Sequence, residues 1–146
     1  MSTRYSDDIL FFDNINILDL ASTSQTPFYL YSETIISNNF LAYQKSFGNN
    51  QHLICYSVKA NSNLTVLSLL SKLGSGFDIV SGGELSRVIK AGGDPRKTVF
   101  SGVGKTEEEI RFALSQDIMC FNVESHDELD TINSIALDEG KKANIS

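Results

Sequence analysis

Residues 76–85 read Gly-Phe-Asp-Ile-Val-Ser-Gly-Gly-Glu-Leu, an apolar run followed by a serine and, three residues later, a glutamate. A nearly continuous apolar run is typical of a parallel strand covered on both faces. Ser81 and Glu84 fit a capping box, in which a hydroxyl and a carboxylate satisfy the unpaired N–H groups at the start of a helix. The stretch therefore predicts a strand, a turn and a helix in direct succession.

The same unit recurs along the chain at a spacing of roughly 21–24 residues. Further apolar runs lie at 53–58, 98–100 and 119–123. Further capping pairs are Thr106 with Glu109 and Ser125 with Glu128. Gly74, Gly92 and Gly140 stand where a left-handed residue ends a helix. We predict an α/β fold with four parallel strands, each followed by a helix.

The amino-terminal region has a different pattern. A helix is predicted from Glu33 to about Phe47, with Ser32 as its N-cap and Gly48 as its stop. Residues 27–31 resemble a short strand, and residues 8–20 resemble one or two separate β-segments. Small polar residues at 21–26 form the expected linker.

Composition limits the classes of function. The chain has 146 residues, with 12 Lys and Arg against 18 Asp and Glu and a net charge of −6, and it has no basic cluster for nucleic acid. It has neither an apolar membrane span nor a signal peptide, so we expect a cytoplasmic protein without membrane contact. Cys55 and Cys120 are expected to be reduced core residues. His52 and His126 are isolated, so no metal site is expected.

Candidate site residues follow the predicted strands, because side chains and helix starts converge at the carboxyl ends of parallel strands. Lys59 directly follows an apolar run, where partial desolvation favours a neutral, nucleophilic amine. The alternative is a lysine that merely reaches solvent from a strand end. Asp78 interrupts the next apolar run, and an acid there calls for a partner, so a contact with Lys59 is one hypothesis.

Two glycine-rich stretches have simpler explanations than ligand binding. Residues 102–106 end in Gly-Lys-Thr like a phosphate-binding loop, but the first glycine of that motif would fall at Val99, inside a strand. Residues 81–84 could present N–H groups to an anion, yet the capping role of Glu84 explains them without a ligand.

Three blocks in order, at 55–63, 76–85 and 100–105, together with 121–125, closely resemble the diaminopimelate decarboxylases. These are pyridoxal-phosphate enzymes of the alanine racemase and ornithine decarboxylase fold type. The resemblance implies that residues 26–146 are the first half of a pyridoxal-phosphate-binding (β/α)8 (TIM) barrel, truncated at the fifth strand. Residues 1–25 would be β-segments of a β-sandwich domain.

The resemblance also implies roles for particular residues. Lys59 would form the Schiff base with pyridoxal 5'-phosphate and act as the catalytic lysine. Asp78 and Glu84 would lie near the cofactor, although capping already accounts for Glu84. The histidine that stacks on the cofactor ring and the residues that hold its phosphate have no counterpart here, so the chain alone is expected to be inactive.

The function implied is the decarboxylation of meso-2,6-diaminopimelate to L-lysine and carbon dioxide, the last step of lysine biosynthesis, by a homodimeric full-length lyase. One alternative is another decarboxylase of the same fold, acting on ornithine, arginine or carboxynorspermidine. Others are a non-catalytic barrel that carries pyridoxal phosphate and a purely structural remnant.

Overall fold

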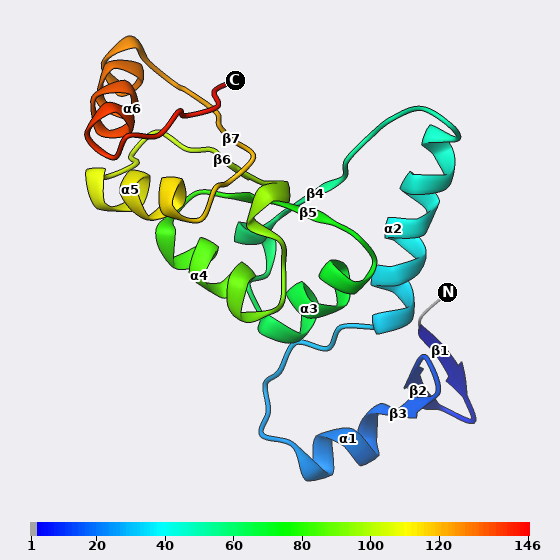
Figure 1. The fold of residues 1–146 in the computed structure, drawn as a ribbon. Coiled ribbons are helices and arrows are strands. Elements are labelled where there is room, and N and C mark those ends of the chain that lie inside the picture. Colours follow the sequence, from blue (N-terminus) through cyan, green and yellow to red (C-terminus); the bar gives the residue numbers. More distant parts are fainter. Residues whose placement is uncertain (1–2) are drawn as a thin grey trace. The chain divides into compact units, whose positions relative to one another are not determined.

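The computed structural model describes residues 3–146, so the first two residues of the predicted 1–25 segment lie outside the described residues. The chain divides into two compact units, Met1–Ala42 and Tyr43–Ser146, which are treated separately below. Figure 1 shows the order of their elements. The predicted domain boundary after residue 25 stays a prediction.

The first unit contains a small antiparallel sheet. Its strands are β1 (Thr3–Ser6), β2 (Ile9–Phe12) and β3 (Ile15–Asn16), paired in the order β1-β2-β3. The β-segments predicted at 8–20 are therefore present up to Asn16. Residues 17–20 are instead part of helix α1 (Ile17–Thr23), because the Asn16 side chain accepts hydrogen bonds from the amides of Leu18 and Asp19 and caps a helix there.

The strand predicted at 27–31 is not formed. The segment is extended but pairs with no strand of the described chain, and Tyr29 is 91% exposed. A strand needs a hydrogen-bonding neighbour, which a local apolar pattern cannot supply. The helix that follows, α2 (Glu33–Phe47), matches its prediction: the Ser32 hydroxyl accepts from the Ile35 amide at 3.1 Å, and Gly48 has a φ of +57°.

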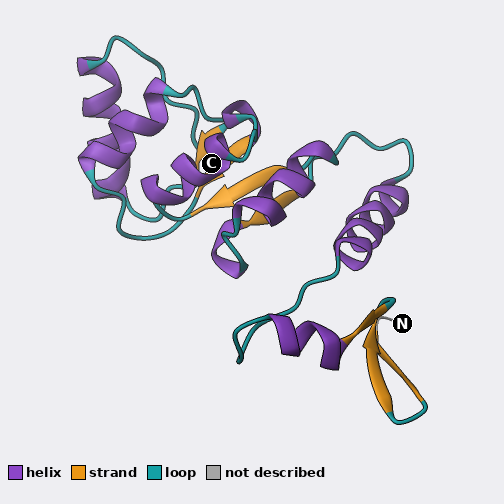
Figure 2. Ribbon diagram, turned by 90° about the horizontal axis from the view of Figure 1, so that it is seen from below, coloured by secondary structure: helices purple, strands orange, loops and turns teal. Residues whose placement is uncertain are grey.

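The second unit is built on a four-stranded parallel sheet. Its strands are β4 (Cys55–Ser57), β5 (Gly76–Ile79), β6 (Thr98–Phe100) and β7 (Cys120–Phe121), in sequential order. Between and after them lie η1 (Val58–Ala60), α3 (Leu64–Lys72), α4 (Gly82–Lys90), η2 (Pro95–Lys97), α5 (Glu107–Ser115) and α6 (His126–Asp138). Helices α3 to α6 follow one another along one side of the sheet (Figures 1 and 2). The four predicted strand-and-helix units are therefore confirmed.

Burial alternates along the strands. Phe77, Ile79, Phe100 and Phe121 are at most 1% exposed and form the core beneath the helices. The residues between them, such as Asp78, are only half-buried. Within residues 3–146 the helices cover one face of the sheet, because sequential strand order with crossovers of one hand sets every helix on the same face.

Helix starts and stops follow the sequence signals closely. Ser81, Thr106 and Ser125 each cap a helix through the side-chain oxygen, and Gly74, Gly92 and Gly140 have positive φ. The reciprocal capping box is complete at Thr106 and Glu109 only. The carboxylates of the other two boxes reach one residue further back, from Glu84 to the Val80 amide and from Glu128 to the Glu124 amide.

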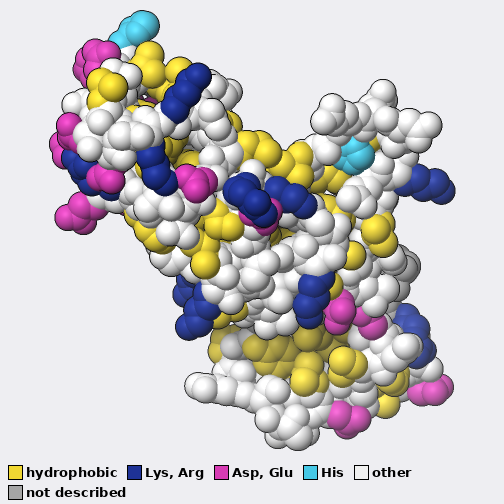
Figure 3. Space-filling model, in the orientation of Figure 1, with side chains coloured by type: hydrophobic (Ala, Val, Ile, Leu, Met, Phe, Trp, Pro, Cys, Tyr) yellow, Lys and Arg dark blue, Asp and Glu magenta, His cyan; other side chains and the backbone are white. Residues whose placement is uncertain are grey.

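The start of a fifth strand is also present. Ile145 forms a parallel bridge with Phe121, and the Ser146 amide donates to the Phe121 carbonyl at 2.8 Å. Within residues 3–146, none of the helices combines the length and apolarity needed to cross a bilayer. On the face drawn in Figure 3, side chains of both charges are interspersed.

Candidate active site at the carboxyl ends of the parallel strands

Lys59 lies in the single turn η1, directly after β4. Val58 beside it is fully buried and anchors the turn, whereas Lys59 is exposed. Its ammonium makes no hydrogen bond or ion pair with any residue of 3–146. The expected partial desolvation is not found, because the sheet face at this end is open to solvent in this chain.

Two asparagines shape the loop between Lys59 and helix α3. The Asn61 side chain accepts from the Asn63 amide at 3.0 Å, and the Asn63 side chain accepts from the Thr65 amide at 2.8 Å. The Tyr56 hydroxyl donates to the Asn61 carbonyl at 3.2 Å. Asparagine side chains form such turns readily, so this part of the sequence fixes the path of the chain that leaves Lys59.

Asp78 lies between two hydroxyls from neighbouring strand ends. Ser101 Oγ donates to Asp78 Oδ1 at 2.6 Å, and Ser57 Oγ donates to Oδ2 at 3.4 Å. Asn122 Nδ2 in turn donates to Ser101 Oγ at 2.8 Å. The contact expected between Lys59 and Asp78 is not formed; the serines satisfy the carboxylate instead. A series of hydrogen-bonded side chains, the polar chain, therefore runs across the ends of all four strands. It consists of Ser57, Asp78, Ser101 and Asn122.

Glu84 and Glu109 bind backbone amides at the start of α4. Glu84 Oε2 accepts from the Val80 amide at 2.7 Å, so its capping role is observed. Glu109 Oε1 accepts from the Gly82 amide at 2.8 Å, which links α4 to α5. Burial opposes its charged form, but bonds from Gly82 and Thr106 outweigh that effect and lower the pKa of the Glu109 carboxyl. Its link to Gly82 was missed, since a capping pattern describes only one helix.

Lys105 belongs to the Gly-Lys-Thr stretch, and no sequence pattern predicted its role in the structure. Its side chain is fully buried, and its ammonium donates to two carbonyls and to Glu128 Oε1. A buried ammonium with three partners is not available to a phosphate, which agrees with the rejection of a phosphate-binding loop. Lys105 lies in a polar, glycine-rich loop after β6, and nothing in that stretch of sequence predicts a buried side chain.

The two cysteines are free thiols on the half-exposed sheet face rather than core residues. Burial, assisted by the negative charge of Asp78, raises the pKa of the Cys55 thiol, and burial raises that of Cys120. Both thiols are therefore mainly protonated at neutral pH.

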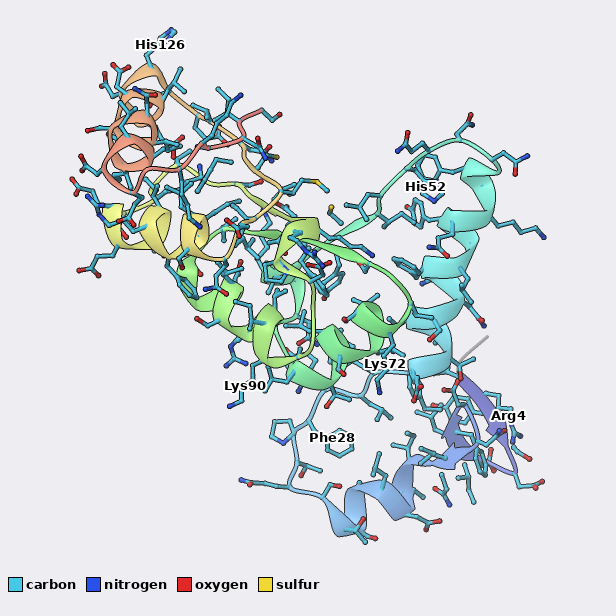
Figure 4. All side chains as sticks on the ribbon, in the orientation of Figure 1. Arg4, Phe28, His52, Lys72, Lys90 and His126 are labelled. Atoms are coloured by element: carbon cyan, nitrogen blue, oxygen red, sulfur yellow. The ribbon has the colours of Figure 1, made fainter. Side chains whose placement is uncertain are left out.

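Histidines and acids do not gather into a metal site in residues 3–146. His52 stacks on Phe47 with ring centroids 4.4 Å apart, and His126 opens α6; both are labelled in Figure 4. Lys72 and Lys90, also labelled, are the last residues of α3 and α4. These helices run antiparallel to the strands, so Lys72 and Lys90 lie near the amino ends of the strands, whereas Lys59 lies at the carboxyl end of β4. The two lysines therefore suit control experiments.

The site thus consists of a lysine directly after the first of four parallel strands, each followed by a helix. A family model described as the pyridoxal binding domain of pyridoxal-dependent decarboxylases matches residues 33–145. The chain belongs to this family.

Its particular relatives are diaminopimelate decarboxylases. That of Vibrio cholerae is 55% identical over 140 residues, which cover 96% of this chain and 34% of the relative. The crystal structure of the Helicobacter pylori enzyme complexed with L-lysine is 52% identical with a TM-score of 0.86, over 89% of this chain and 33% of that one. The enzyme from M. jannaschii is 36% identical with a TM-score of 0.93, over 99% and 35%. The chain thus spans about a third of the length of these relatives.

The residues present fit pyridoxal phosphate as far as this chain extends. Lys59 offers a primary amine without a bonding partner among residues 3–146, at the end of the barrel where such sites lie. Small or polar side chains line the neighbouring sheet face and leave it open. They are Cys55, Ser57, Gly76, Asp78, Ser101, Cys120 and Asn122, with Val99 as the one larger apolar residue among them.

Proposed function

We propose that this chain supplies the cofactor-binding lysine of a diaminopimelate decarboxylase, which converts meso-2,6-diaminopimelate to L-lysine and carbon dioxide. The exposed Lys59 amine at the end of β4, in a chain of this family, is the observation that carries the proposal. The relatives named as diaminopimelate decarboxylases support the choice of substrate.

Lys59 would hold pyridoxal phosphate covalently through Nζ, and the same atom, once released, can carry a proton to or from the substrate carbon. When bound, the cofactor accepts the electron pair left as the carboxylate departs. Asp78 would set a negative charge beside the cofactor, held in place by the serine hydroxyls. Glu84 would act less directly, because its Oε2 is engaged with the Val80 amide.

The proposal assigns residues 26–146 to the barrel and residues 1–25 to a β-sandwich domain. It includes a cytoplasmic, homodimeric enzyme in which groups outside this chain bind the cofactor phosphate and the substrate. The chain by itself should release no more carbon dioxide from meso-diaminopimelate than buffer does.

Reductive trapping tests the role of Lys59. The chain is incubated with pyridoxal phosphate, reduced with borohydride, digested and analysed by mass spectrometry. We expect the adduct at Lys59, its loss in Lys59→Arg, and no change in Lys72→Arg. Equal modification of Lys59, Lys72 and Lys90 would contradict the proposal, because it would indicate ordinary surface reactivity.

A chimera tests the reaction itself. This chain replaces the matching part of the Vibrio cholerae enzyme, and release of carbon dioxide is measured with meso-diaminopimelate, ornithine and arginine. We expect activity with the first substrate alone, and none after Lys59→Arg. A folded chimera that binds pyridoxal phosphate but turns over no meso-diaminopimelate would refute the proposal.

A further inference from the structure

Lys105 is buried in the loop between β6 and α5, and all its hydrogens are used. Its side chain is 0% exposed. Nζ donates to the Gly102 carbonyl at 2.7 Å, the Asn122 carbonyl at 2.9 Å and Glu128 Oε1 at 2.8 Å. An ammonium has three hydrogens, so these three acceptors satisfy it completely.

The partners of Lys105 come from two different loops. Gly102 belongs to its own loop after β6, whereas Asn122 and Glu128 belong to the loop and helix after β7. The Glu128 side chain is only 12% exposed, and its second oxygen accepts from the Glu124 amide at 2.7 Å. The ion pair therefore fixes two strand ends against each other in a site shielded from water, where bonds between charged groups are strong.

Asn122, whose carbonyl accepts from Lys105, also takes part in the polar chain through its side chain. Its Nδ2 donates to Ser101 Oγ at 2.8 Å, and Ser101 Oγ donates to Asp78 Oδ1 at 2.6 Å. A hydroxyl has one hydrogen, so a Ser101 hydrogen directed at the carboxylate leaves its oxygen to accept from Asn122. A series of hydrogen bonds through Asn122 and Ser101 thus connects the Lys105 ammonium to the Asp78 carboxylate.

The geometry points to Lys105 as a positioning residue. Through Asn122 and Ser101 it holds the Asp78 carboxylate in place at the carboxyl ends of the strands. It does not touch the reacting atoms, since its ammonium is enclosed. Its relevance to decarboxylation rests on the proposed function, but the positioning itself does not. Residues that hydrogen-bond to a site residue fix its orientation, and the geometry of the site depends on them.

Nuclear magnetic resonance of the labelled full chain tests the positioning. Because exchange with water is slow for an enclosed ammonium, Lys105 should give an observable Nζ signal, which Lys105→Met removes. The same variant should shift the Asn122 side-chain amide and the Asp78 carboxyl carbon. An unchanged Asp78 signal in a folded Lys105→Met variant would overturn the inference.

Two further variants serve if Lys105→Met does not fold. Ser101→Ala removes the hydrogen bond to Asp78 and should shift the Asp78 carboxyl signal. Ser101→Thr keeps a hydroxyl at this position and should return the Asp78 signal to its original place. The matched control is Lys141→Met. Lys141 also pairs with a carbonyl and an acid, Leu114 and Asp117, but lies outside the polar chain. A shift of Asp78 equal in the control and in Ser101→Ala would count against the inference.

The trapping assay supplies the functional readout. Ser101→Ala should slow adduct formation at Lys59, and both Ser101→Thr and Lys141→Met should not. Equal rates in Ser101→Ala and the unaltered chain would refute a role of the polar chain in the site. If the unaltered chain forms no adduct, the proposed function fails, and the Asp78 signal alone decides the positioning.

Discussion

Replacement of Gly76 by alanine places a methyl group against the backbone of the neighbouring strand connection. Gly76 opens β5 opposite Cys55 of β4, and its amide donates to the Ile54 carbonyl at 2.9 Å. A Cβ at this position overlaps the Lys97 carbonyl oxygen and lies 2.8 Å from Cys55 Sγ. Real Cβ atoms essentially never approach other atoms within 3.0 Å, so a neighbour has to move.

The size of the effect follows from which neighbour moves. The Cys55 thiol can rotate, but the Lys97 carbonyl belongs to the backbone that leads into β6. Overpacking of this kind costs about 1–3 kcal/mol, and we expect the upper end because backbone must shift. For a chain of this size, about 3 kcal/mol corresponds to a melting temperature lower by about 6–12 °C.

Urea unfolding followed by circular dichroism measures the change in the free energy of unfolding. The matched control is Gly83→Ala in the first turn of α4, where a Cβ meets only Ser81 Oγ, at 3.8 Å. Alanine in a helix is favoured over glycine by up to about 1 kcal/mol, so the control should be as stable as the unaltered chain or more so. A Gly76→Ala variant within about 0.5 kcal/mol of the unaltered chain would refute the reasoning.

Two further predictions concern ionisable groups. Because its bonds to amides lower the pKa of Glu109, the carboxylate stabilises the fold above the ordinary glutamate pKa of about 4.3, and this contribution is lost as the pH falls below it. Glu109→Gln should therefore cost about 1 kcal/mol at pH 7 and progressively less as the pH falls below about 4.3, as urea unfolding over a pH series would measure; a pH-independent difference would contradict this. Since burial raises the pKa of Cys55 and Cys120, both should react with iodoacetamide more slowly than a free cysteine at pH 8 and accelerate at higher pH. Mass spectrometry gives the rates, and reaction as fast as free cysteine would disprove the effect.

Local patterns were sufficient to predict the repeating part of the fold. The capping side chains Ser81, Thr106 and Ser125 and the glycine stops act within a few residues of where they stand, so their sequence signal is complete. Residues 17–20 were assigned wrongly because a short apolar run fits either a strand or a helix. The residue that decides between them is Asn16, whose side chain caps the helix.

The polar chain could be predicted only in part. Asp78 was predicted because it interrupts an apolar run, but the distances that join it to Ser101 and Asn122 depend on the pairing of β5, β6 and β7. The bond from Lys105 to Asn122 and the link from Glu109 to Gly82 gave no sequence signal, because each joins separate β/α units. Contacts between units depend on the assembled sheet, whereas capping depends on the local chain.

The bonds between loops also limit how this half-barrel can change over evolution. Barrel enzymes diversify by lengthening the loops after their strands, which carry the working residues. Here Lys105 joins the loop after β6 to the loop after β7, and Glu109 joins the start of α5 to the start of α4. An insertion in either loop would separate a buried charge from its partners, so their lengths must remain fixed or change together. Variation among descendants of this chain should therefore gather in other connections, such as the exposed residues 48–51.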